Sequence, residues 1–93
     1  MDDKVRLQAV VHGHVQGVNF RYYTRQQARQ LGVTGYVRNL WDGTVRVVAE
    51  GTRRNVTRLL NWLHKGPSMA FVEKVDVQWL PYTGEFQRFE VRY

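Results

Sequence analysis

Residues 12–21, HGHVQGVNFR, combine the residue types that a small protein uses to bind an anion. Gly13 and Gly17 lie on either side of the tripeptide HVQ, and Arg21 follows where a helical pattern begins. Glycines beside a helix N-terminus let several main-chain N–H groups point at one anion, and a guanidinium forms paired hydrogen bonds with phosphate or carboxylate oxygens. The segment predicts a phosphate-binding loop, although a glycine-containing turn followed by a surface arginine also occurs in domains that bind no ligand.

The chain lacks the usual groups for covalent or metal-assisted phosphate chemistry. It has no cysteine, and the adjacent acids Asp2 and Asp3 do not form an Asp-x-Asp nucleophile motif. His12, His14 and His64 do not form an obvious metal set, so we expect no metal and no cofactor. His14 is interpreted as a loop side chain beside the bound anion. Hydrolysis at this loop would then use water directly, assisted by positioning and electrostatics.

Direct attack by water limits the class of substrate. A phosphate monoester has a poor leaving group and hydrolyses very slowly without help. A mixed carboxylic–phosphoric anhydride instead expels a carboxylate, whose conjugate acid has a pKa of about 4, so no general acid is needed. Asn39, near the end of the segment YVRN, is a candidate for orienting the water because an amide accepts one hydrogen bond and donates another. Its alternative role is that of a turn residue before Asp42 and Gly43.

Hydrophobic periodicity predicts the elements that position these residues. Residues 5–11 alternate between apolar and polar and predict a half-buried strand. Residues 34–51 predict a β-hairpin whose Asp42–Gly43 pair forms a type I′ turn. Two amphipathic helices are predicted, one from residue 20 to a stop at Gly32 and one from residues 51–52 to Gly66 and Pro67. In the first helix, Arg25 and Arg29 are expected to lie on a solvated face.

The C-terminal third predicts two further strands. Val75, Val77 and Trp79 alternate on one face of the first, and FEVRY offers a short last strand with Phe89, Val91 and Tyr93 in register. The order βαββαβ predicts one domain, residues 1–93, with a ferredoxin-like α+β fold of the split βαβ type. Its sheet is expected to be antiparallel, with both helices on the face that carries Val5, Val45, Val47 and Val75.

Composition limits the location and the partners of the chain. Of the 93 residues, 43% are hydrophobic and 24% are charged, which is typical of a globular domain. The acidic N-terminus and the absence of a long apolar run favour a cytoplasmic protein that does not bind a membrane. The net charge of +6 favours an anionic partner. Small size favours a monomer.

Taken together, these segments resemble the acylphosphatases. GHVQGVNFR is similar to the family signature Gly-x-Val-Gln-Gly-Val-x-Phe-Arg, and LGVTGYVRNLWDGTV is similar to Leu-Gly-x-x-Gly-Trp-Val-x-Asn-x-x-x-Gly-x-Val. The resemblance implies hydrolysis of a small-molecule acyl phosphate without metal or cofactor. It implies that Arg21 binds the phosphate and that Asn39 orients the attacking water. It also assigns substrate binding to the loop residues His14, Val15, Gln16, Gly17, Val18, Asn19 and Phe20.

The chain departs from the family pattern at three positions: His14 replaces a common Arg, Asn19 replaces a smaller residue, and Tyr36 replaces the usual Trp.

A nucleic-acid-binding module of the same topology is the main alternative to this function. Such a module needs stacking aromatic residues on its third strand, where this chain has TVRVVAEG, so no nucleic acid is expected as a partner. The same domain also occurs inside larger carbamoyl-transfer and hydrogenase-maturation proteins. A ferredoxin-like metal carrier would need a Cys-x-x-Cys loop.

Overall fold

The computed structural model describes residues 3–93 and contains the predicted order of elements. The elements are β1 (Lys4–His14), α1 (Phe20–Gln30), β2 (Thr34–Asn39), β3 (Val45–Thr52), α2 (Arg53–Lys65), β4 (Phe71–Leu80) and β5 (Phe89–Arg92). The first six form the βαββαβ pattern, and β5 is the short C-terminal strand. The prediction of a ferredoxin-like α+β fold is confirmed.

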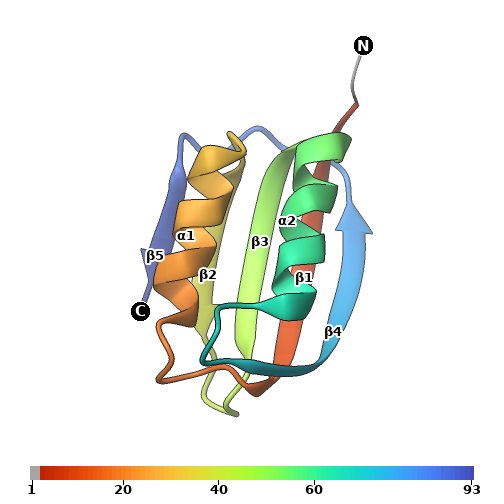
Figure 1. Ribbon diagram of the computed structural model, residues 1–93. Coiled ribbons are helices and arrows are strands. Elements are labelled where there is room, and N and C mark those ends of the chain that lie inside the picture. The colour runs from red at the N-terminus through yellow and green to blue at the C-terminus, as the bar shows by residue number, and fades with distance from the viewer. Residues whose placement is uncertain (1–2) are drawn as a thin grey trace.

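The strands form one five-stranded sheet in the order β4-β1-β3-β2-β5. The first four strands pair antiparallel, as predicted, whereas β5 pairs parallel with β2 and makes the sheet mixed. Both helices cover the same face of this sheet (Figure 1). Because Arg92 pairs with Arg38, the end of β5 reaches the end of the sheet where β2 finishes at Asn39.

Alternation along the strands places the core between the sheet and the helices. Val5, Val45 and Val47 are buried there, and Val75 packs against them as predicted. Val77 and Trp79 pair with β1 residues whose side chains also enter the core, but each is about 40% exposed because β4 is an edge strand. The rest of the core is supplied by both helices, β1, β2, β3 and β5, with these fully buried members: Leu7, Val11, Phe20, Val37, Leu59, Leu63 and Phe89.

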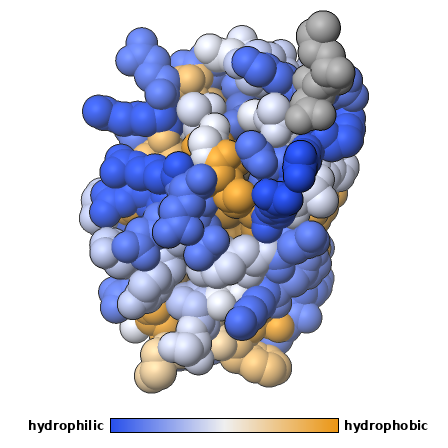
Figure 2. Space-filling view, turned by 45° about the horizontal axis from the view of Figure 1, so that its top comes forward, coloured by the Kyte–Doolittle hydropathy of each residue, from blue (hydrophilic) through white to orange (hydrophobic). Residues whose placement is uncertain are grey.

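The surface over the helices is mostly hydrophilic, with a small apolar area showing near its centre (Figure 2). Among the described residues, no helix has the length and apolar content required to cross a membrane.

The connection between β2 and β3 differs from the predicted type I′ turn. The Leu40 N–H donates to the Thr44 carbonyl (2.9 Å) and the Gly43 N–H donates to the Leu40 carbonyl (3.2 Å), which makes a three-residue loop. Gly43 has a φ of 91°, but Asp42 lacks the positive φ that a type I′ turn requires. The Asp42 carboxylate instead accepts hydrogen bonds from the Thr44 hydroxyl (2.6 Å) and N–H (3.1 Å). These bonds lower the pKa of Asp42 and stabilise the longer loop.

A buried carboxylate holds the segment between β4 and β5 against the sheet. The Glu50 side chain, which is 0% exposed, accepts hydrogen bonds from the Thr83 hydroxyl and N–H (both 2.8 Å), the Gly84 N–H (3.0 Å) and Arg6 (3.2 Å). Burial acts to raise the pKa of Glu50, but the hydrogen bonds from Thr83, Arg6 and Gly84 outweigh it and lower the pKa. Glu50 therefore connects the β4–β5 segment to the centre of the sheet.

Candidate active site

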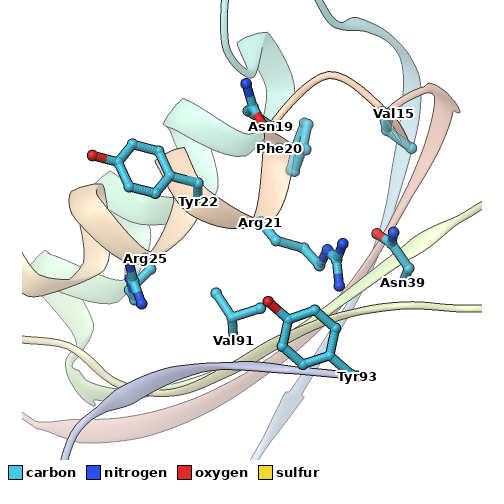
Figure 3. Close-up of a pocket in the computed structure, with 10 residues that line it drawn as sticks. Val15, Asn19, Phe20, Arg21, Tyr22, Arg25, Asn39, Val91 and Tyr93 are labelled. Atoms are coloured by element: carbon cyan, nitrogen blue, oxygen red, sulfur yellow. The ribbon is translucent and has the colours of Figure 1, made fainter.

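A cavity of about 310 Å³ lies beside the start of α1, where the β1–α1 loop, the end of β2 and the end of the chain meet. It is lined by Val15, Gly17, Asn19, Phe20, Arg21, Tyr22, Arg25, Asn39, Val91 and Tyr93 (Figure 3). The parallel pairing of β5 with β2 brings Val91 and Tyr93 to the site, because Arg92, which lies between them in the chain, pairs with Arg38 near the end of β2.

The β1–α1 loop takes its shape from residues with special backbone conformations. The pairing of β1 with β4 shifts between His12 and Gly13, and a Cβ at Gly13 would lie 2.1 Å from the Phe71 carbonyl oxygen, so only glycine fits this close approach. Further along, Gly17 has a φ of 76° and Asn19 a φ of 60°, both in the left-handed region. Alternation of left- and right-handed residues turns successive N–H groups toward one side of a loop.

The main-chain N–H groups of this loop are free to bind a ligand. None of the N–H groups of residues 16–22 donates a hydrogen bond to an acceptor within residues 3–93. The first one that does is the Tyr23 N–H, which donates to the Asn19 carbonyl (3.1 Å) and begins the helical pattern. These donors lie at the positive end of the α1 dipole, so the loop is suited to an anion.

Gln16 fixes the loop against the neighbouring hairpin. Its Nε2 donates to the carbonyl oxygens of Leu40 (2.7 Å) and Thr44 (2.9 Å), at the two ends of the β2–β3 connection. The loop is thereby held at a defined position relative to Asn39, which directly precedes Leu40. Gln16 is one of the predicted substrate-binding residues; its side chain contacts the hairpin, and its main-chain N–H stays free.

Arg21 and Asn39, the two predicted catalytic residues, line the same cavity. Arg21 comes from the first turn of α1 and Asn39 from the end of β2, and their side chains extend toward a common space (Figure 3). The Arg21 guanidinium carbon lies 4.8 Å from the centre of the Tyr93 ring. The Oδ1 atom of Asn39 is buried and has no hydrogen-bond partner within residues 3–93. Such a group is rare in folded proteins and calls for a partner from outside the chain.

The predicted loop residues divide into two groups. Val15, Gly17, Asn19 and Phe20 line the cavity, whereas His14, Gln16 and Val18 do not. His14 is exposed at the end of β1 and Val18 packs against the core, so neither side chain belongs to the cavity wall. The main-chain N–H groups of Gln16 and Val18 are nevertheless among the free donors of the loop.

Four residues that line the cavity were not predicted as site residues from the sequence: Tyr22, Arg25, Val91 and Tyr93. The register of FEVRY indicated that Val91 and Tyr93 share a face, but only pairing with β2 shows that this face meets the loop. Arg25 was expected on a solvated face and is instead half-buried in the cavity wall. Arg29 is exposed, but its Nε and Nη2 donate to the Phe89 carbonyl (3.3 and 3.2 Å) and attach α1 to β5.

None of the three histidines lines this cavity. His12 Nε2 is 2.8 Å from Asp76 Oδ2 on the neighbouring strand β4. Within residues 3–93, no three His, Asp or Glu side chains are grouped so that they could hold a metal ion.

Known proteins match nearly the whole length of this chain. A family model described as acylphosphatase matches residues 7–91. A protein named acylphosphatase from Pelotomaculum thermopropionicum is 50% identical over 90 residues, which cover 97% of this chain and 98% of that protein. This chain belongs to the acylphosphatase family. The relatives carry acylphosphatase names, so the comparison gives no support to a nucleic-acid-binding module.

Solved acylphosphatase structures share the fold described above. The structure of an acylphosphatase from Coxiella burnetii superposes with a TM-score of 0.91 at 37% identity, covering 97% of this chain and 94% of that one. An acylphosphatase from Bacillus subtilis gives a TM-score of 0.92 at 28% identity, covering 96% of this chain and 99% of that one. The described residues of this chain therefore share the fold of solved acylphosphatases.

Proposed function

We propose that this acylphosphatase hydrolyses acyl phosphates to a carboxylate and inorganic phosphate by direct attack of water. The N–H groups of residues 16–22 and the Arg21 guanidinium hold the phosphoryl oxygens. The Asn39 carboxamide holds the attacking water. No side chain forms a covalent bond to the substrate in this scheme.

The observation that carries the proposal is the unpartnered Asn39 Oδ1 in the wall of the cavity that Arg21 also lines. Leaving a buried carbonyl oxygen without a partner costs about 1–3 kcal/mol, so a water that donates a hydrogen bond to it is held strongly. Arg21 and the loop N–H groups are donors, and the Asn39 oxygen is an acceptor. The cavity therefore offers separate places for an anion and for a water molecule.

The reaction balances without a protein acid or base. The water oxygen attacks phosphorus, the bond from phosphorus to the acyl oxygen breaks, and the electron pair leaves with the carboxylate. The conjugate acid of that leaving group has a pKa of about 4, so it departs without being protonated. The water proton passes to a phosphoryl oxygen or to solvent. Arg21 and the fixed N–H groups stabilise the charge on the phosphoryl oxygens during transfer.

Steady-state kinetics with benzoyl phosphate test this mechanism. Arg21→Ala removes the only charged phosphate ligand, and we expect kcat/KM to fall by about 10³-fold or more, given that one lost transition-state donor alone costs about 10²–10³. Arg58→Ala, which removes an exposed arginine on α2 outside the cavity, is the matched control and keeps the wild-type value. Near-wild-type turnover by Arg21→Ala would remove Arg21 from the mechanism. No hydrolysis by the wild type would reject the activity itself.

We also propose that residues 1–93 act as one domain and that the chain works as a monomer in the cytoplasm. Its partner is a small-molecule acyl phosphate, with no metal, cofactor, membrane or nucleic acid required. Light scattering after size-exclusion chromatography should give the mass of one chain, and a dimer mass would contradict the monomer. Activity that disappears with a chelator and returns with a divalent cation would contradict the metal-free mechanism.

A further inference from the structure

A second arginine lies in the cavity beyond those the mechanism uses. Arg25 follows Arg21 by one helical turn of α1 and lines the same cavity. Neither guanidinium forms a salt bridge within residues 3–93, and no Asp or Glu side chain lines the cavity. Two unneutralised cations therefore face one space, and the proposed phosphoryl site accounts for only one of them.

The two arginines lie at different ends of the cavity. In the view of Figure 3, Asn39 and the Arg21 guanidinium lie on one side of the cavity, Arg25 lies on the other, and Val91 lies between them. The Tyr93 ring lies on the Arg21 side, with its centre 4.8 Å from the guanidinium carbon. A phosphoryl group held at the Arg21 end can direct its acyl group past Val91 toward Arg25. The far end of the acyl group then meets Arg25.

The neighbours of Arg25 leave its hydrogen-bond donors free. Its guanidinium carbon lies 5.6 Å from the centre of the exposed Tyr22 ring, and its N–H groups donate no hydrogen bond to an acceptor within residues 3–93. Arg29, the next member of the same stripe, donates to the Phe89 carbonyl and does not line the cavity. Of these two arginines, Arg25 is the one positioned to bind a ligand.

We propose that Arg25 forms a second anion subsite, which favours acyl phosphates whose acyl group carries a negative charge at the end remote from the phosphate. The inference rests on the proposed function, since it places the reacting phosphate at Arg21. A carboxylate or a second phosphate supplies the charge that the subsite recognises. The subsite is a specificity determinant that touches the substrate away from the reacting atoms.

Two substrates of equal shape test the subsite. 4-Carboxybenzoyl phosphate carries the remote charge, and 4-carbamoylbenzoyl phosphate replaces it with a neutral amide. The readout is the ratio of their kcat/KM values, charged over neutral. We expect a wild-type ratio of about five, the factor that corresponds to about 1 kcal/mol for a partly exposed ion pair, expressed mainly in KM. In Arg25→Gln the ratio should fall to about one, and Arg25→Lys should keep most of the preference.

The controls separate the subsite from other causes. Arg58→Gln removes the same charge from α2, outside the cavity, and should keep the wild-type ratio. Raising the salt concentration should lower the wild-type ratio toward one, without any variant being needed. A wild-type ratio at or below one, an unchanged ratio in Arg25→Gln, or an equal loss in Arg58→Gln would each overturn the subsite. Failure of the wild type to hydrolyse either substrate would instead reject the proposed function.

Discussion

At the scale of single residues, Asn39 and Arg21 reach one cavity from different elements and offer opposite hydrogen-bonding groups. Arg21 can only donate, whereas the buried Oδ1 of Asn39 can only accept and has no partner in residues 3–93. This difference separates holding the phosphate from holding the water. The two roles should therefore respond differently to mutation.

Asn39→Ala should lower kcat by about 10²–10³, or about 2.7–4 kcal/mol of barrier, because it removes a preorganised group that acts in the transition state. Inhibition by inorganic phosphate should stay near the wild-type value, since Arg21 and the loop N–H groups remain. Asn55→Ala on α2, outside the cavity, serves as the control. A wild-type kcat, or a loss of phosphate inhibition as large as the loss of kcat, would show that Asn39 does not orient the water.

At the scale of elements, the site depends on the loop after β1 being fixed to the hairpin that ends with Asn39. Gln16 makes this connection through two hydrogen bonds to main-chain carbonyl oxygens. Gln16→Glu keeps the size of the side chain but removes both donors and places a carboxylate against two acceptors. We expect the free energy of unfolding in urea to fall by about 1–3 kcal/mol. The kcat for benzoyl phosphate should fall as well.

The matched control for that substitution is Gln87→Glu, which adds the same charge at an exposed position outside the cavity. It should leave both the stability and kcat close to the wild type. Equal effects of the two substitutions would indicate a general charge effect. Unchanged stability and kcat in Gln16→Glu would mean that the loop keeps its position without this connection.

The elements also show how far the sequence predicts this molecule. Local patterns predicted both helices and the strands, because such patterns depend on residues close together in the chain. The shared site of Arg21 and Asn39 was indicated by the resemblance to the family motifs. The parallel pairing of β5 with β2 is non-local, so the placement of Tyr93 in the cavity was not predicted. Arg25 was missed for the same reason, since an arginine stripe on a helix looks solvated until the neighbouring strand is known. The turn at Asp42 depended on a side-chain hydrogen bond to Thr44 that propensity alone does not reveal.

At the scale of the whole molecule, the two faces of the sheet carry different stabilising contacts. The helices and an apolar core cover one face, and on the other Glu50 holds the segment between β4 and β5. That segment leads into β5, which supplies Val91 and Tyr93 to the cavity. Protonation of one carboxyl group on the far face therefore bears on the stability of the element that completes the site.

The pKa of Glu50 is lowered in the folded chain. Its contribution to stability is therefore fully present above the pKa of a glutamate in the unfolded chain, about 4.3, and is lost as the pH falls below that value. The wild-type free energy of unfolding in urea should therefore decrease between about pH 5 and pH 3. Glu50→Gln should be less stable at neutral pH by about 1–3 kcal/mol and should show a shallower decrease. Some dependence of stability on pH should remain, because the pKa values of Asp42, Glu85 and Glu90 are lowered as well.

The control is Glu73→Gln, because Glu73 is exposed and forms no salt bridge within residues 3–93. This variant should follow the wild-type profile. Parallel profiles for the wild type and Glu50→Gln would show that the buried carboxylate does not control the acid sensitivity of the fold.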